Sequence, residues 1–485
     1  MVISTQLRNQ HLLWRAGFGP GTLSADELEG TSNKQLLKSL FKKSEKLPPY
    51  IDVADPMVKL LYLGQNEMVK SRRELTEDDK KLIREKSRDG NRALNLTWLN
   101  QMVVSEEQLR EKTALFWHGH FACRTQNILH QQQLLDAIRT NSLGKFPDLL
   151  RAVSKSGAML NFLNNNQNRK DHPNENFARE VMELFTMGRG NYTEDDIKEA
   201  ARAFTGWGTD PAGNFVFRKG QHDTGKKSLL GKSGHFDGDD VLNILVEHPQ
   251  TAQYITRKIY RYFVNEKEDE NNIKWLTDRF YSNGYDIAGL LHDIFSSDWF
   301  YDQSNIGSII KSPVLLIAGI RRAIPMQISN EDVQITLQRL LGQQLFYPPN
   351  VAGWPGGRNW IDSSSLMLRL RIPQMIYAED PITMRPKDDD DQMMGMKEKE
   401  KVKQKQAAQR GGQIISATVN WDAYTKLYEK VPREKLLDAI SNTVLQTSNS
   451  VSNTVLDKYS DSSSREAYIR TATIQLMSTP EYQLC

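Results

Sequence analysis

Residues 171–207 restrict the fold more than any other segment, because their pattern fits two short helices joined by a glycine-rich turn. The first helix can begin at Pro173, since the N–H that proline lacks has no partner in a first turn. Four apolar side chains then recur at helical spacing and would face a core. They are Phe177, Val181, Leu184 and Phe185. Thr193 with Asp196 forms a capping box that predicts the second helix.

Polar side chains on the first of these helices lie beside its apolar face rather than opposite it. At 100° per residue they form a second stripe. The stripe comprises Asn176, Glu180, Glu183 and Met187. Carboxylates placed at the edge of a core either bind a ligand or pair with cations.

Length and composition exclude several classes of protein. A chain of 485 residues exceeds one typical hydrophobic core, so two or three packed lobes are expected. No apolar run approaches the roughly 20 residues needed to cross a bilayer. The N-terminus has no basic stretch followed by an apolar one, which predicts a cytoplasmic location. A net charge of +3, from 63 basic and 60 acidic residues, gives no global field that would recruit nucleic acid.

The chain divides into four predicted segments. Residues 1–165 form an N-terminal helical lobe and 166–380 a central helical core. The composition of 381–412 is that of a charged linker, and 413–485 form a C-terminal helical segment. Strand-like stretches at 214–218 and 226–231 predict one β-hairpin with Gln221-His222-Asp223 between its strands. The predicted fold class is therefore all-α, mostly helical, with a small β-hairpin insert.

Two cysteines cannot build a disulfide framework. We expect Cys485 to be exposed.

Residues 341–365 are too rich in proline, glycine and tryptophan for regular structure and too aromatic for disorder. They predict an ordered loop packed onto the body of the protein. Trp354 and Trp360 could offer flat apolar faces to a carbohydrate or a peptide. The alternative is that the loop fills a gap between lobes.

A metal centre is one interpretation of the polar residues. It would collect His118, His120, Glu180, Glu183, His222 and Asp223. Imidazole and carboxylate are ligands for zinc, manganese or iron, and a bound ion lowers the pKa of its water to about 7. Glu180 or Glu183 would then act as general base. A glycine between His118 and His120 allows a turn that brings both rings together. No HExxH or CxxC pattern fixes the ligand geometry.

A structural role is the other interpretation. Glu180 and Glu183 would form partly buried ion pairs, and both histidines would bond loop backbone. The candidate partners are Arg124, Arg179 and Arg202. Glu175 and Arg179 already stand in the favourable i, i+4 orientation.

Several motifs together resemble the bacterial DUF1800 family, a domain of unknown function. They are HLLWRAGFGP, LREKTALFWHGHF, NENFAREVMELFTMGRGNYTEDDIKEAARAFTGW, HDTGKKSLLG, GHFDGDDVL and PPNVAGWPGGRNWI. The resemblance implies a mostly helical protein and supplies no activity. Many relatives look exported and are encoded beside a second family that resembles sulfatases, which implies a sulfatase-like partner. This sequence departs from the exported pattern, since no signal is visible.

Two classes of function follow. The first is a binding or assembly protein with a structural Glu/Arg/His polar core, using Trp354, Trp360 and Arg179 for contact. The second is a metal-dependent hydrolase. Its catalytic groups would be Glu180 and Glu183, and its metal ligands His118, His120, Glu183 and His222.

Overall fold

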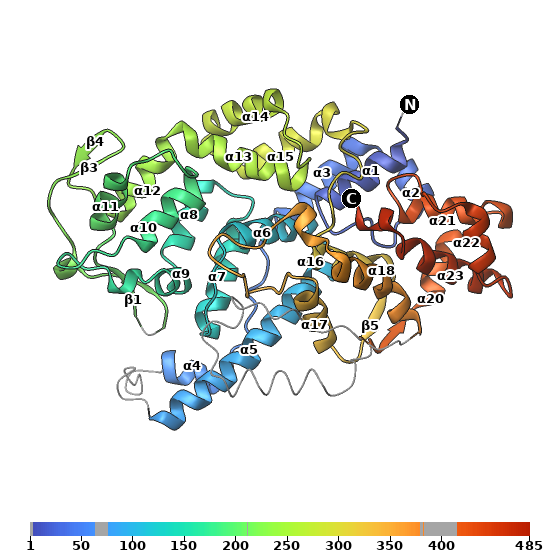
Figure 1. Cartoon of the computed structure of the whole chain (residues 1–485), viewed down its shortest axis with the longest axis horizontal. Coiled ribbons are helices and arrows are strands. Elements are labelled where there is room, and N and C mark those ends of the chain that lie inside the picture. Colours follow the sequence, from blue (N-terminus) through green and yellow to red (C-terminus); the bar gives the residue numbers. More distant parts are fainter. Residues whose placement is uncertain (1–2, 64–75, 211, 379–381, 383–414) are drawn as a thin grey trace.

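The computed structural model describes residues 3–63, 76–210, 212–378, 382 and 415–485, and these are mostly helical (Figure 1). Within them the strands form three small antiparallel pairs. The predicted fold class is confirmed. The linker predicted at 381–412 lies outside the described residues, except for Ile382.

The N-terminal third of the chain is built from helices. They are α1 (Thr5–Arg15), α2 (Ala25–Gly30), α3 (Asn33–Ser44), α4 (Pro56–Leu63), α5 (Glu77–Val104), α6 (Gln108–His120), α7 (Ile128–Asn141), α8 (Phe146–Ser154), α9 (Gly157–Phe162) and the 3-10 turn η1 (Asn165–Gln167). The long helix α5 begins at a capping box formed by Thr76 and Asp79. Its second half buries Leu94, Trp98 and Leu99 against the core.

The central part holds the predicted pair of helices and most of the strands. Its elements are α10 (Asn176–Glu180), the π-helix η2 (Val181–Thr186), α11 (Glu194–Ala203), β1 (Trp207–Thr209), β2 (Phe215–Phe217), η3 (Lys219–Gln221), β3 (Lys227–Leu229), β4 (Lys232–Gly234), α12 (Gly238–Glu247), α13 (Pro249–Phe263), α14 (Glu270–Ser282), α15 (Ile287–Ser296), η4 (Asp298–Tyr301), α16 (Pro313–Ala323), β5 (Met326–Ile328), α17 (Asp332–Leu340), η5 (Gly357–Trp360) and α18 (Ser363–Ala378). In Figure 1, α8–α12 form one end of the molecule, and α13–α15 connect that end to the N-terminal helices.

The C-terminal segment packs against the beginning of the chain (Figure 1). It comprises β6 (Ala417–Val419), α20 (Trp421–Thr425), η6 (Lys426–Tyr428), η7 (Arg433–Lys435), α21 (Leu436–Val444), α22 (Asn453–Tyr459), α23 (Arg465–Met477) and η8 (Pro480–Gln483). Gln10 on α1 donates to the backbone oxygens of Asn442 (2.8 Å) and Thr443 (3.0 Å) on α21. Buried apolar side chains form a cluster that runs from Leu12 to Cys485, so the two ends of the chain share a core.

Residues 171–207, here named the helical hub, contain the two predicted helices with one difference. The first helix widens into a π-turn, in which the Thr186 hydroxyl donates to the Val181 oxygen at 2.7 Å. A π-turn holds more residues than an α-turn, so later side chains rotate around the axis. Phe185 is buried as predicted, but Met187 is also fully buried and does not belong to the polar stripe.

The prediction of one hairpin at 214–231 is wrong in its pairing, although both strands exist. β2 pairs with β1, and β3 pairs with β4. Each strand therefore pairs with its neighbour in the sequence, and β3 and β4 are joined by a two-residue turn. Leu230 and Gly231 between β3 and β4 both have positive φ (49° and 78°), which suits a two-residue hairpin turn. Leucine rarely adopts this conformation, so the turn had no local sequence signal.

Cys485 is buried, which corrects the expectation of an exposed thiol. Its N–H donates to the Ile309 oxygen at 2.8 Å, and the Lys311 N–H donates to the Gln483 oxygen at 2.8 Å. The last residues of the chain are therefore paired through their backbone with residues 309–311. Among the described helices, none combines the length and apolar character that a bilayer crossing requires.

Candidate functional site

The polar residues of the hub meet a loop that follows it in the chain. Helix α11 begins at the predicted capping box, in which the Asp196 N–H donates to the Thr193 hydroxyl at 3.1 Å. In the same box, Asp196 Oδ2 accepts the Thr193 N–H at 2.8 Å. The second carboxylate oxygen, Oδ1, accepts the Leu230 N–H at 2.7 Å. A side chain that caps α11 therefore also holds the β3–β4 turn.

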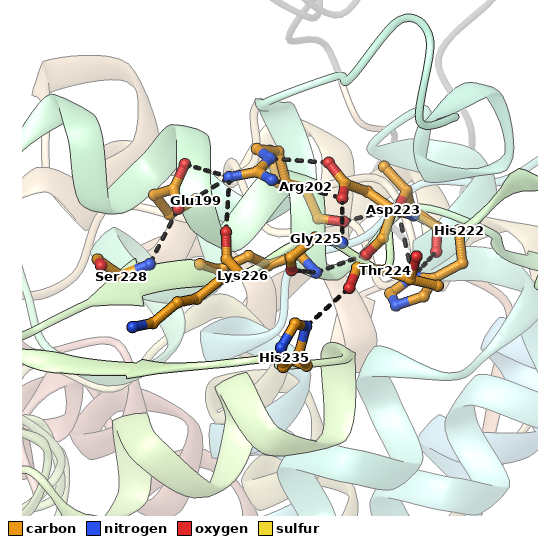
Figure 2. A network of polar contacts seen from close by, with 12 residues as sticks. Glu199, Arg202, His222, Asp223, Thr224, Gly225, Lys226, Ser228 and His235 are labelled. Atoms are coloured by element: carbon orange, nitrogen blue, oxygen red, sulfur yellow. Dashed lines mark hydrogen bonds and ion pairs between the residues drawn. The ribbon is translucent and has the colours of Figure 1, made fainter.

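Arg202 joins two carboxylates in what we call the Arg202 network (Glu199, Arg202 and Asp223). Figure 2 shows its guanidinium between them, with Nε 2.8 Å from Asp223 Oδ2 and Nη1 2.8 Å from Glu199 Oε1. The guanidinium lowers the pKa of Asp223. The same contacts raise the pKa of Arg202. Asp223 is therefore charged at neutral pH, and both carboxylates are paired with the Arg202 guanidinium.

Backbone groups of the loop complete this network (Figure 2). The Ser228 N–H donates to Glu199 Oε2 at 2.9 Å, and the Gly225 N–H donates to Asp223 Oδ1 at 2.8 Å. Charged acceptors that bond backbone N–H groups fix loop geometry, since such bonds are stronger than neutral ones. The network thus fastens residues 223–228 to α11.

His222 lies next to this loop and bonds the backbone of the hub. Its Nδ1 is 2.9 Å from the Thr205 oxygen, and because a carbonyl can only accept, Nδ1 carries the proton. Its ring also contacts Phe217 edge-on. His222 therefore has Nε2 as its remaining acceptor.

Glu183 is neutralised within the hub. It accepts the Tyr192 hydroxyl at 2.7 Å and pairs with Arg189. Burial raises the pKa of the Glu183 carboxyl, but the bonds from Tyr192 and Arg189 outweigh it, and the net direction is down. The cation is not one of the three expected from the sequence. Arg189 lies in the glycine turn between the two helices, where sequence spacing does not indicate a partner.

Glu180 differs from Glu183, one turn away. Burial and the charge of Glu183 raise its pKa. Arg179 points elsewhere, pairing with Glu175 at 3.1 Å, as its spacing predicts, and with Glu194 at 2.7 Å. Glu180 is thus a carboxyl whose charged form is disfavoured by its surroundings.

His118 and His120 do not converge. Helix α6 continues through both, and side chains at i and i+2 leave a helix on different sides. His118 accepts the Phe346 N–H at Nε2 (3.2 Å), and burial lowers its pKa to about 3. His120 donates from Nε2 to the Phe185 oxygen (3.1 Å). Its pKa is also lowered, by burial and then by the charge of Lys258. Both imidazoles are neutral at neutral pH.

The tryptophan loop, residues 341–361, packs onto α6. The Trp354 ring lies 5.3 Å from the His118 ring, and Trp360 is only 7% exposed. A Cβ at Gly353, where φ is +85°, would lie 2.4 Å from the Gly119 oxygen, so only glycine fits there. The structure therefore brings His118 and Trp354 together, and buries one of the two predicted contact tryptophans.

The residues predicted as metal ligands bond different partners and do not form one cluster. Among residues 3–63, 76–210, 212–378 and 415–485, no three His, Cys, Asp or Glu side chains form a group that could hold a metal ion. The other polar site, missed from the sequence, is a cavity between α5 and α17. The only signal of this cavity in the sequence is the i, i+4 pair Arg88 and Arg92 on α5.

Comparison with known proteins identifies a family but no activity. The chain belongs to the DUF1800 family, described as proteins of unknown function, whose family model matches residues 11–484. The resemblance drawn from the motifs is confirmed. No curated protein and no solved structure matches the chain.

Proposed function

We propose that this protein is a non-catalytic binding or assembly protein whose Glu, Arg and His side chains form a structural polar core. One observation carries the proposal: Glu183, Glu199 and Asp223 are each neutralised by an arginine. Carboxylates used in this way hold helices and loops in place.

The protonation states support the same conclusion. A general acid or base works best with a pKa near the working pH. His118, with a pKa of about 3, takes up no proton near neutral pH. Glu183 has a lowered pKa and is a weaker base than a free carboxylate.

The contact surface in this proposal is the tryptophan loop, with Arg179 on the hub as a second contact. The Trp360 side chain of this loop is buried, while Arg358 and Asn359 are exposed. A sulfatase-like protein encoded nearby is the proposed partner, and the cytoplasm the proposed location.

A metal-dependent hydrolase is the second candidate, and Glu180 is the observation that favours it. A carboxyl with a raised pKa beside another carboxyl is a common feature of catalytic sites. In this candidate Glu180 is the general base and Glu183 a ligand of zinc, manganese or iron, with His118, His120 and His222.

Two substitutions separate the candidates. Glu183→Gln removes the charge that Arg189 and Tyr192 share, so a structural role predicts a loss of roughly 1–2 kcal/mol of stability in urea unfolding. Asp195→Asn, in an exposed pair with Lys198, is the matched control and should lose less than about 0.5 kcal/mol.

Glu180→Gln tests the chemistry. Protein supplied with zinc or manganese is assayed against chromogenic phosphate, sulfate and carboxylic esters. The binding proposal expects no metal-dependent hydrolysis in the wild type. Hydrolysis that Glu180→Gln abolishes, with the helical circular dichroism spectrum retained, would establish the hydrolase instead.

A further inference from the structure

A cavity of about 570 Å³ opens between α5, α17 and the start of the tryptophan loop. The two helices lie side by side in Figure 1. The volume is within the range of about 300–1,000 Å³ that small-molecule sites occupy. Three arginines and one tyrosine line it together with asparagine, threonine, glutamine, isoleucine and one aspartate, so its walls combine hydrogen-bonding groups with apolar surface and one aromatic ring.

Positive charge in this lining exceeds negative charge by two. The lining holds Arg88, Arg92 and Arg339 against the single carboxylate of Asp332. Asp332 is already bound to Arg92, with Nη2 2.6 Å from Oδ2. Arg88 has only an exposed contact of 3.6 Å to Asp89, which water screens. Among the residues that the structure describes, two of these guanidinium groups therefore have no strong anionic partner.

Arg339 is the more unusual of the two. Within the described part of the chain, it forms no ion pair and no side-chain hydrogen bond, and its Nε is buried without a partner. Burial lowers its pKa. Placing a guanidinium out of water without an anion is costly, and a bound anion would remove that cost.

The helix that carries Arg339 is held firmly in place. Gln338, the preceding residue, exchanges two amide hydrogen bonds with Asn95 on α5, at 2.9 and 2.8 Å. Gln338 also accepts the Leu345 N–H at 3.0 Å. These bonds fix α17 against both other walls, so Arg339 is presented to the cavity by rigid elements.

Tyr347 supplies an aromatic surface at the same cavity. The Arg124 guanidinium lies 5.2 Å from its ring centroid, which adds a further cation close to the lining. An aromatic ring beside guanidinium groups suits a ligand with an organic body and an anionic group.

We propose that this cavity binds a small organic dianion, the phosphate monoester of a compact organic molecule. Arg88 and Arg339 bind the oxyanion, and Tyr347 packs against the organic body. The ligand's two charges match the excess of two in the lining. This inference rests on the proposed binding function and gives it a ligand class.

Isothermal titration calorimetry of the full chain tests it, with glucose 6-phosphate, glucose 6-sulfate and uncharged glucose as probes. Glucose 6-phosphate should bind saturably, the singly charged glucose 6-sulfate should bind more weakly, glucose should not bind, and added salt should weaken binding. Arg339→Met should weaken ester binding about tenfold or more, because a charge-assisted bond is lost. Arg84→Met, an exposed arginine of α5 that does not line the cavity, is the matched control and should bind as the wild type.

Stability gives an independent readout of the same residue. Because Arg339 lacks a partner, Arg339→Met should unfold at a temperature no lower than that of the ligand-free wild type. Arg339→Lys, which keeps the charge but loses the planar fork, should bind with intermediate affinity. Failure of glucose 6-phosphate to bind, or equal affinities for Arg339→Met and the wild type, would overturn the inference.

The fate of the ester separates the two proposals. Intact ester recovered after titration supports a binding site in a non-catalytic protein. Release of inorganic phosphate or sulfate by the wild type, but not by Arg339→Met, would support the dianion site and overturn the proposed non-catalytic function.

Discussion

Replacing Arg202 with methionine should destabilise the protein by about 2–3 kcal/mol. An exposed ion pair contributes about 0–1 kcal/mol, and breaking a buried one costs about 3–5 kcal/mol. Arg202 is 29% exposed, and its partners Glu199 and Asp223 are 23% and 20% exposed, so the network lies between these limits. Both carboxylates keep a backbone N–H donor after the substitution, which limits the loss.

The loss should depend on pH in a defined direction. Arg202 holds the pKa of folded Asp223 below its ordinary value of 3.8. Its contribution is therefore fully present above that value and disappears as the pH falls through the folded pKa. The difference between wild type and Arg202→Met should be largest near neutral pH and smaller in acid.

Urea unfolding followed by far-ultraviolet circular dichroism measures the effect, and limited proteolysis at residues 219–237 reports whether the loop loosens. Lys198→Met, on the same helix in an exposed pair with Asp195, is the control and should change stability by less than about 0.5 kcal/mol. Arg202→Met that unfolds at the wild-type urea concentration, with the loop equally resistant to protease, would refute the structural role of the network.

Three further substitutions test the packing around the site. Glu111→Ala should cost about 3–5 kcal/mol in urea unfolding, because its partner Arg139 is only 1% exposed and would keep an unpaired charge; a cost below about 1 kcal/mol would contradict this. Burial lowers the pKa of Lys311 to about 7 from 10.5. Between these pH values the unfolded chain binds more protons than the folded one, so the free energy of unfolding should rise with pH. Lys311→Met should reduce the rise in this free energy between pH 7 and pH 9 by roughly 2 kcal/mol. An unchanged rise would contradict the lowered pKa of Lys311 in the folded protein. Gly353→Ala should lower the thermal unfolding temperature, since its Cβ would collide with the Gly119 oxygen, and a wild-type value would show that the loop moves freely.

The parts of the fold that depend on neighbouring residues could be predicted from the sequence. Thr193 and Asp196 lie three residues apart and cap α11 as their spacing indicates. Arg179 pairs with Glu175 one turn away for the same reason. Helix periodicity likewise located the buried Phe177.

Features that depend on contacts between residues distant in the sequence could not be predicted from it. The composition of β2 does not show that it pairs with β1, which precedes it, rather than with β3. The burial of Met187 follows from a π-turn that periodicity does not encode. Arg339 and Arg88 are far apart in sequence, so only the packing of α17 on α5 shows that they share a cavity.

The metal content of the purified protein tests the central claim, that the acidic and imidazole side chains around the hub have a structural role. Wild-type protein and Glu183→Gln, both purified without chelator, are measured by inductively coupled plasma mass spectrometry for zinc, manganese and iron. The account predicts substoichiometric metal in both proteins, with Glu183→Gln less stable. One ion per chain in the wild type, lost in Glu183→Gln while the helical spectrum is retained, would contradict it.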